Sequence, residues 1–479
     1  MATTFTCSLD TPGSKLNHVW SHTVGSGHAA LALRADWQAQ MRKAHDDLGV
    51  RHVRFHGILD DEMGTYLIEC DKDLYSFFNA DQIFDFLVSI GMKPFVELSF
   101  MPSALSSGGD IVFFYKGNVT PPRDYAKWAE VIKKLVQHWV DRYGATEVRS
   151  WFFEVWNEPN LDAFWKGKQA DYFKLYQYTA NAIREVDAQL RVGGPATAND
   201  EWIPDFLGFC EKNQLPCDFI STHHYPTDAL GKPGDDTETQ LSDAPRDVLI
   251  QRVQQVLKEA GDKPVYYTEW SSSSNPFFAF HDEPYAAAFL FKNMLEVADM
   301  VKAYSWWTFS DIFNENYFSS TPFHGSFGLQ TIHGVAKPAY RAMQLLNGLG
   351  IERLDVSGTH PTVDAWAVRA NANNVDLLLC NHAFPHHAID PEVVTFHVET
   401  KHKAKIAMVQ RVDEEHCNSR QAWVDMGSPE YLDAEQVDEL HEASALKAEP
   451  VAIQSHQGSF DITLNLPPHA IAAVRVELA

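Results

Sequence analysis

The sequence has 479 residues, of which 45% are hydrophobic and 22% charged, the composition of a globular protein with room for one large domain and a smaller one. Its formal net charge of −25 repels phosphate backbones and anionic lipid surfaces. No apolar run approaches the roughly 18 residues that a membrane span requires. These features argue against nucleic acids and membranes as partners.

The cysteines indicate a reducing environment. Six are scattered along the chain without a Cys-x-x-Cys pair, which is typical of free thiols rather than of a disulfide framework. The first twenty residues lack the basic start and the apolar segment of a secretory signal. We therefore expect a cytoplasmic protein.

Residues 14–350 alternate short apolar runs with longer amphipathic stretches. Apolar residues at three-to-four spacing predict helices between the runs, for example over Asp124–Tyr143, Ala170–Gln189, Asp247–Ala260 and Tyr285–Val301. The predicted strands are His18–Trp20, His52–His56, Pro94–Phe100, Ser150–Trp156, Leu190–Gly194, Phe219–Tyr225, Val265–Trp270 and Ala303–Phe309.

Eight strands that alternate with helices predict an α/β fold, a (β/α)8 TIM barrel. A doubly wound sheet could use the same number of strands, and periodicity alone does not separate the two. A doubly wound sheet would, however, place its ligand at one switch point. Here polar and aromatic residues follow many of the strands, which favours the barrel.

The pattern changes after residue 350. Strand-like segments follow one another with turns between them and with few helical crossovers, which predicts a C-terminal antiparallel β-sandwich over 351–479. Residues 1–13 are also strand-like, and we expect them to join that sheet. The predicted strands are Ala365–Ala370, Val375–Leu379, Val393–Val398, Ile406–Val412, Phe460–Leu464 and Ile471–Val476.

The strongest chemical signal lies where a hydrophobic strand ends in Asn157-Glu158-Pro159. Proline cannot continue the ladder, so a barrel would place Glu158 at its C-terminal mouth, where barrel enzymes keep their catalytic groups. Desolvation by aromatic neighbours would keep this carboxyl protonated as a general acid. A glutamate in the first turn of a helix would give the same local pattern.

A second carboxylate points to the chemistry. Glu269 ends the seventh predicted strand and Glu158 the fourth, so the two can face each other across the barrel mouth. Glycoside hydrolysis needs one carboxyl to protonate the leaving oxygen and one to attack the anomeric carbon. The pair predicts a retaining glycosidase with carboxyl groups about 5–5.5 Å apart.

The segments at the strand ends resemble the family 39 glycoside hydrolases, which include β-xylosidases and α-L-iduronidases. The resemblance covers nearly the whole chain and rests on residues 52–65, 149–167, 219–226, 265–274 and 304–329. It implies that Glu158 is the acid/base, that Glu269 is the nucleophile and that Asn157 contacts the sugar 2-hydroxyl. It further implies a substrate-binding role for His56, His223, Tyr225, Trp307 and Glu315. We also expect Phe164 to bind substrate, as a wall on the leaving-group side.

One segment departs from the family pattern. Xylosidases of the family usually read Glu-Trp-Asn at the nucleophile, with a tyrosine a few residues later. Ser271 and Ser274 stand at those positions here. The departure concerns the shape of the pocket beside the nucleophile and therefore the sugar that it accepts.

The sequence therefore predicts an exo-acting β-D-xylosidase that releases xylose from the non-reducing end of short xylo-oligosaccharides, with no metal and no cofactor. An α-L-iduronidase is the alternative within the family, and it should place a basic residue against the substrate carboxylate. A metal-dependent barrel isomerase or hydrolase is the alternative from another class, since the chain has 22 histidines. No interface can be read from the sequence, which leaves a homo-oligomer open.

Overall fold

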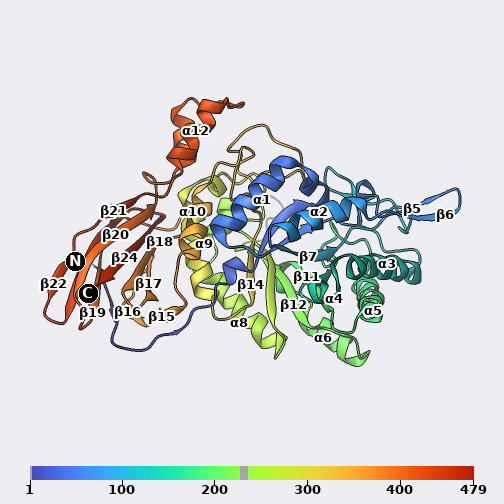
Figure 1. The fold of residues 1–479 in the computed structure, drawn as a ribbon, viewed down its shortest axis with the longest axis horizontal. Coiled ribbons are helices and arrows are strands. Elements are labelled where there is room, and N and C mark those ends of the chain that lie inside the picture. The colour runs from blue at the N-terminus through green and yellow to red at the C-terminus, as the bar shows by residue number, and fades with distance from the viewer. Residues whose placement is uncertain (1–2, 227–235) are drawn as a thin grey trace.

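The computed structural model describes residues 3–226 and 236–479, so residues 1 and 2 of the predicted N-terminal segment lie outside it. The chain forms a barrel with a β-sandwich packed against one side, and both termini lie in the sandwich (Figure 1). Among the described residues, no helix has the length and apolar character to cross a membrane.

Eight parallel strands form the barrel, and their order in the sheet is their order in the chain. The barrel closes between its last and first strands, where Phe309 N donates to Gly25 O at 2.9 Å. This confirms the predicted TIM barrel. The strands are β3 (Thr23–His28), β4 (His52–His56), β7 (Lys93–Leu98), β10 (Phe152–Val155), β11 (Arg191–Thr197), β12 (Phe219–His224), β13 (Val265–Trp270) and β14 (Ala303–Trp306).

Helices surround the barrel and bury their apolar faces against it (Figure 1). In the longest of them, Asp124 caps the N-terminus by accepting from the N–H groups of Ala126 and Lys127, while Trp128 and Trp139 are fully buried. The helices are α1 (Ala35–Leu48), α2 (Phe78–Ser89), α3 (Tyr125–Tyr143), α4 (Ala145–Val148), α5 (Gln169–Val186), α6 (Ile203–Lys212), α7 (Thr237–Ser242), α8 (Val248–Ala260), α9 (Pro284–Val297) and α10 (Pro338–Asn347).

The first predicted strand was wrong. Residues Val19–Ser21 form a short 3-10 helix, and the first barrel strand is β3, Thr23–His28. Two glycines in β3 hide its strand character in the sequence, since glycine is depleted in strands. At Gly25 the reason is space, because a Cβ atom there would lie 2.4 Å from the ring of Trp307.

The barrel interior is layered along its axis. At the N-terminal ends of the strands an aromatic cluster fills the interior, and within it Phe95 and Phe152 stack at 4.9 Å between ring centroids. Because side chains alternate along a strand, Glu154 points into the barrel one layer above Phe152, beside Arg54. Arg54 and Glu154 thus form a polar layer, which lies between the aromatic cluster and the C-terminal mouth of the barrel.

Two sheets form the β-sandwich, in the orders β16-β1-β19-β23-β22 and β2-β15-β17-β18-β24-β20-β21. The N-terminal strand β1 (Thr3–Ser8) pairs antiparallel with β16 (Val356–Ser357) but parallel with β19 (Glu392–Glu399), so the sandwich is not wholly antiparallel. The other strands are β2 (Ser14–Lys15), β15 (Glu352–Leu354), β17 (Val363–Asn371), β18 (Asn374–Asn381), β20 (Ala404–Val412), β21 (Ala448–Pro450), β22 (Gln454–His456), β23 (Ser459–Leu466) and β24 (Ala470–Leu478).

The division into residues 1–13, a barrel of 14–350 and a sandwich of 351–479 remains our proposal. The short strand β2 pairs with β15 of the sandwich, so the first residues after 13 still contact that sheet. The helices α11 (Ser419–Asp425) and α12 (Ala434–Ala443) are inserted in the sequence between β20 and β21, and α12 projects from the sandwich (Figure 1). They reach back to the barrel, where the Trp423 ring packs 5.5 Å from that of Phe323.

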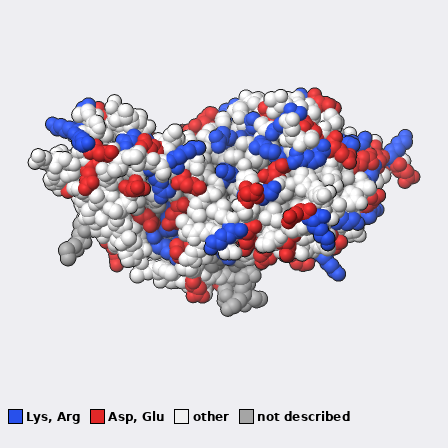
Figure 2. All heavy atoms as spheres, turned by 90° about the horizontal axis from the view of Figure 1, so that it is seen from below, with Lys and Arg blue, Asp and Glu red and all other residues white. Residues whose placement is uncertain are grey.

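Two short hairpins complete the described fold, β5 (Tyr66–Glu69) with β6 (Lys72–Tyr75) and β8 (Ile111–Val112) with β9 (Gly117–Asn118). The first projects from the barrel on the side away from the sandwich (Figure 1). On the molecular face seen in Figure 2, acidic and basic side chains are intermingled. On that face the acidic side chains therefore do not form one continuous patch, because basic side chains lie between them.

Candidate active site

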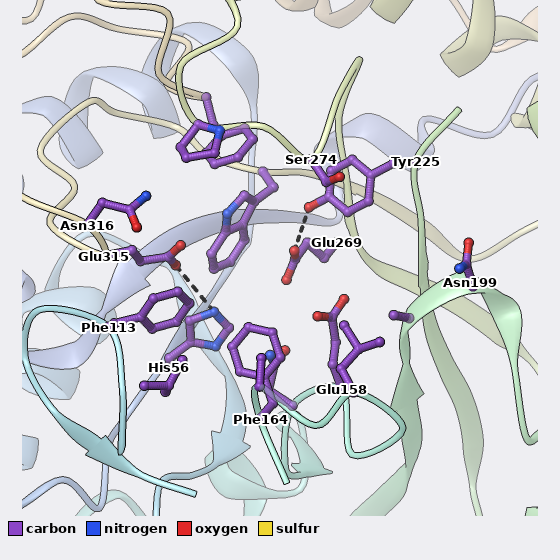
Figure 3. Close-up of a pocket in the computed structure, with 18 residues that line it drawn as sticks. His56, Phe113, Glu158, Phe164, Asn199, Tyr225, Glu269, Ser274, Glu315 and Asn316 are labelled. Carbon is purple, nitrogen blue, oxygen red and sulfur yellow. Dashed lines mark hydrogen bonds and ion pairs between the residues drawn. The ribbon is translucent and has the colours of Figure 1, made fainter. Parts of the chain in front are cut away.

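A cavity of about 260 Å³ opens at the C-terminal ends of the barrel strands (Figure 3). Eight of the nine predicted site residues line it: His56, Asn157, Glu158, Phe164, Tyr225, Glu269, Trp307 and Glu315. The ninth, His223, is fully buried and is not among the described lining residues. The structure thus gathers these eight residues from the ends of five different strands around one small space.

The two carboxylates face each other across this cavity. Glu158 lies in the segment that follows β10, and its N–H donates to Ala196 O at 2.8 Å. Glu269 lies on β13. Both are nearly buried, with 6% and 7% of the residue exposed. One oxygen of each lies within 4.8 Å of the other. This spacing is near that of retaining glycosidases and shorter than the roughly 6.5–9.5 Å that leaves room for a water in inverting ones.

Glu269 is held by a hydroxyl and a guanidinium. Tyr225 Oη donates to Glu269 Oε1 at 2.5 Å, and Arg54 Nη1 lies 3.4 Å from Oε2. Burial raises the pKa of Glu269, and Arg54 opposes that rise. Burial and the adjoining carboxylate together raise the pKa of Tyr225 well above its usual value, so its hydroxyl stays a donor.

Arg54 is the main residue that the sequence analysis missed. It is fully buried and forms ion pairs with Glu154 at 2.6 Å and Glu97 at 2.8 Å, and it donates to Asn157 Oδ1 at 2.9 Å. Burial alone would lower the pKa of Arg54, but its carboxylate partners raise it. Its position in the sequence could have identified it. Arg54 lies two residues before His56 in the same strand, so the two side chains point to the same side of the sheet.

His56 connects this layer to the cavity wall. Its Nδ1 lies 2.7 Å from Glu97 Oε2, and its Nε2 lies 3.6 Å from Glu315 Oε1, the contact drawn in Figure 3. Burial, Glu269 and Glu97 raise the pKa of Glu315 well above its usual value. The Trp307 ring lies 4.8 Å from that of His56, which leaves a flat aromatic surface beside these polar groups.

His223 lies beneath the carboxylates rather than on the cavity wall. Its Nδ1 is 3.0 Å from Glu158 Oε1, and its Nε2 is 3.1 Å from Thr268 Oγ1. Burial lowers the pKa of His223 well below its usual value, and Arg54 adds to the effect. The imidazole is therefore neutral in the ordinary pH range.

Other wall residues lie outside the barrel strands, in loops and in the short 3-10 helix Ala198–Asp200, and were not predicted. Phe113 and Phe327 add aromatic surface, while Asn199 and Asn316 add amides. Of the two serines that depart from the family pattern, Ser274 lines the cavity. Ser271 is fully buried and is not among the described lining residues.

One group of side chains has the geometry of a metal site. Glu158, His223 and Glu269 each offer a ligand atom within 4.8 Å of the others. This was not expected from the sequence, because the three residues come from three different strands. The His223 nitrogen in question faces Glu158, and Glu269 accepts from Tyr225, so these ligand atoms already have protein partners.

The sequence of the chain matches a known protein family. The model described as glycosyl hydrolases family 39 matches residues 6–461. The chain belongs to glycosyl hydrolase family 39. It is thus a glycoside hydrolase, and a carbohydrate is its substrate.

Several known proteins resemble the chain over nearly its whole length. A β-xylosidase of Caldicellulosiruptor saccharolyticus is 48% identical over 471 residues, which cover 97% of this chain and 96% of the relative. A β-xylosidase of Geobacillus stearothermophilus is 36% identical over 443 residues, covering 90% and 87%. The crystal structure of the family 39 enzyme from Xanthomonas axonopodis pv. citri superposes with a TM-score of 0.89 at 32% identity, covering 100% and 98%.

Proposed function

We propose that this family 39 enzyme is a retaining, exo-acting β-D-xylosidase that releases xylose from the non-reducing end of short xylo-oligosaccharides. The observation that carries the proposal is the pair Glu158 and Glu269, whose oxygens lie within 4.8 Å in a cavity of about 260 Å³. A cavity of this size holds about one sugar ring, which fits exo action. The relatives named β-xylosidase support xylose as that sugar.

The first step is a displacement at the anomeric carbon. A Glu269 oxygen attacks this carbon while the Glu158 carboxyl transfers its proton to the glycosidic oxygen, and the bond to the shortened oligosaccharide breaks. The product is a xylosyl ester of Glu269. Arg54 and Tyr225 hold the Glu269 carboxylate at its two oxygens and so fix its direction of attack.

The second step reverses the roles. The Glu158 carboxylate accepts a proton from water, the water oxygen attacks the anomeric carbon, and the ester bond to Glu269 breaks. Two inversions give net retention. The short spacing of the carboxylates suits this path, because the attacking water takes the place that the leaving sugar has vacated.

The remaining lining residues would bind the sugar. Asn157, which Arg54 orients, is placed to contact the 2-hydroxyl, where a hydrogen bond strengthens in the transition state. His56 and Glu315 present polar groups to the other hydroxyls, beside the Trp307 ring. His223 takes no direct part in binding in this proposal, because it lies beneath Glu158.

Two alternatives make different demands on the site. An α-L-iduronidase needs a cation for the substrate carboxylate, and no Lys or Arg is among the described residues that line the cavity. A metal-dependent enzyme would use Glu158, His223 and Glu269 as ligands. A metal enzyme would lose activity with a chelator, whereas the glycosidase proposed here keeps it.

Two finer features extend the proposal. The six cysteines are free thiols, which suits a cytoplasmic enzyme acting on imported oligosaccharides. Ser274 takes the place of a larger residue of the family beside the nucleophile. It leaves room on that side of the cavity, so we expect the enzyme to tolerate pentosides other than xylosides.

A panel of nitrophenyl glycosides tests the proposed function. We expect the β-D-xyloside to give the highest kcat/KM, and we expect NMR to show β-xylose as the first product before mutarotation. Fastest turnover of a uronide would support the iduronidase. First appearance of α-xylose would overturn the retaining mechanism.

A further inference from the structure

A chain of buried polar groups runs from the ion pair at the centre of the barrel to Glu158. Arg54 Nε donates to Glu154 Oε2 at 2.6 Å, and Thr268 Oγ1 lies 2.7 Å from Glu154 Oε1. His223 bridges Thr268 Oγ1 at 3.1 Å and Glu158 Oε1 at 3.0 Å. Arg54, Glu154, Thr268 and His223 are all fully buried, so water does not replace any of these contacts.

The direction of the first hydrogen bonds follows from the number of protons available. Glu154 is paired with the Arg54 guanidinium, and an ionised carboxylate only accepts hydrogen bonds. The single hydroxyl proton of Thr268 is therefore donated to Glu154. Thr268 Oγ1 has only lone pairs left for its other neighbour, and so it accepts from His223 Nε2–H.

This assignment determines the tautomer of His223. A neutral imidazole carries one proton, and with that proton on Nε2 its Nδ1 is an acceptor. Glu158 Oε1 is the partner at hydrogen-bonding distance from Nδ1, since Glu269 Oε2 is 3.6 Å away. A contact between the acceptor Nδ1 and a carboxyl oxygen is a hydrogen bond only when the carboxyl carries the proton.

The surrounding charges agree with a neutral His223. Burial is the largest effect that lowers its pKa, and Arg54, His56 and His224 lower it further. Two carboxylates, Glu154 through Thr268 and Glu269 at 3.6 Å from Nδ1, would favour a cation. The pKa of His223 nevertheless remains well below its usual value.

We infer that Thr268 and Glu154 are positioning residues that hold His223 in its Nε2–H tautomer, so that His223 Nδ1 accepts a hydrogen bond from Glu158 and keeps that carboxyl protonated. The inference rests on the proposed role of Glu158 as the acid/base. In this arrangement neutral His223 accepts a hydrogen bond from the protonated Glu158 carboxyl through the lone pair of Nδ1. A charged partner of the two carboxylates would have the opposite effect, because it would stabilise the ionised form of Glu158.

The arrangement serves both steps of the reaction. Before the first step the hydrogen bond retains the proton on Glu158, and the O–H leaves Nδ1 when the carboxyl transfers this single proton to the glycosidic oxygen. Afterwards the Glu158 carboxylate faces the Nδ1 lone pair, which does not stabilise its negative charge. The carboxylate therefore readily takes the proton of the attacking water. No proton passes through Thr268 or Glu154 in either step.

The test compares Thr268→Val with Thr268→Ser. Valine has nearly the shape of threonine but lacks the hydroxyl, so Nε2–H loses its acceptor and the proton moves to Nδ1, where it stabilises ionised Glu158. We expect the basic limb of the pH profile of kcat/KM to move down by roughly half to one pH unit. Thr268→Ser keeps the hydroxyl and should restore the wild-type limb.

A second readout uses the leaving group. An aryl xyloside with a very acidic phenol, such as the 2,4-dinitrophenyl compound, needs no proton from Glu158, whereas xylobiose does. We expect Thr268→Val to lower kcat/KM on xylobiose about tenfold and to affect the dinitrophenyl substrate much less. A general loosening of the fold would lower both alike, and an unchanged limb with equal losses would overturn the inference.

Glu158→Ala separates this inference from the proposed function. If Glu158→Ala keeps full activity on xylobiose, the acid/base assignment itself fails. If it loses xylobiose activity while Thr268→Val behaves as wild type, the tautomer assignment alone fails. Should Thr268→Val not fold, neutron diffraction of the wild-type protein can show which nitrogen of the His223 ring carries the proton. Deuterium on His223 Nε2 is expected, and deuterium on Nδ1 alone would overturn the inference.

Discussion

Arg54 Nε lies 2.6 Å from Glu154 Oε2, and neither side chain is exposed to solvent. Glu97 and Glu269 also contact the guanidinium, so a single buried cation serves several buried carboxylates. Such a cluster contributes little to stability compared with apolar packing, but the loss of one partner leaves uncompensated charges in the interior.

Arg54→Met is therefore expected to lower the free energy of unfolding by about 3–5 kcal/mol and to abolish measurable xyloside turnover. Denaturant unfolding followed by tryptophan fluorescence measures the first effect. Arg51→Met is the matched control, because Arg51 is exposed and its replacement should change stability by less than about 0.5 kcal/mol. Equal stability of the two variants would contradict the role assigned to Arg54.

Gly25→Ala is expected to damage substrate binding. The added methyl group would lie 2.4 Å from the Trp307 ring, so the ring must move away from its place beside His56. We expect kcat/KM to fall about tenfold and stability to fall by about 1–3 kcal/mol, as for overpacking in a close-packed interior. Gly208→Ala on α6 is the control. Apart from its chain neighbours and the backbone of its own helix, no described heavy atom lies within 4 Å of its added Cβ, so activity should be unchanged.

Lys337→Met is expected to loosen the loop that carries Phe327. Lys337 Nζ is fully buried between Asp282 and Asp311, at 2.6 Å from each, and these carboxylates accept from the N–H groups of Gly325 and Gly328. Without the ammonium group the two aspartates repel each other.

For Lys337→Met we expect a loss of about 3–5 kcal/mol in the free energy of unfolding and a rise in KM for xylobiose. The exposed Lys302→Met serves as the comparison in the same unfolding and kinetic assays. Wild-type KM in Lys337→Met would show that the buried cluster does not position the cavity wall.

The stability of the enzyme should fall in mild acid. Burial lowers the pKa of His52 to about 4, against about 6.5 in an unfolded chain. Between these values the unfolded chain holds more protons, so the free energy of unfolding decreases as the pH falls from about 6.5 to 4. The full gap corresponds to roughly 3 kcal/mol.

Urea unfolding at several pH values tests this with His52→Asn. His52 Nδ1 lies 2.9 Å from His22 O, and the asparagine amide can still donate to that carbonyl while it does not titrate. The variant should lose less stability on acidification than the wild type does. An unchanged slope between pH 6.5 and 4 would show that His52 is not responsible.

The sequence is most informative where one strand end carries a complete local signal. The segment Asn157-Glu158-Pro159 follows β10 at the barrel mouth, and Glu269 closes an apolar run that is recognisable as β13. Two such signals in a barrel determine which end holds the site. The order of the strands then follows from their alternation with helices, and the structure confirms this part of the prediction.

Other features could not be read from the sequence because their causes lie far along the chain. The strand needs glycine at position 25 because the ring of Trp307, far along the sequence but adjacent in the closed barrel, occupies the space beside it. His223 lies beneath the carboxylates rather than on the cavity wall. The alternation of side chains along a strand predicts that it points into the barrel but not how far below the mouth it lies. Phe113 and Phe327 belong to loops, which have no periodicity to identify their inward-facing residues.

Trapping of the covalent intermediate tests the central claim most directly. A 2-deoxy-2-fluoro-β-D-xyloside with a dinitrophenyl leaving group forms the ester but hydrolyses slowly, because the fluorine destabilises the oxocarbenium-like transition state of the second step. Peptide mass spectrometry should find the fluoroxylosyl group on Glu269. Its attachment to another residue, or turnover without any adduct and with α-xylose as the first product, would contradict the account.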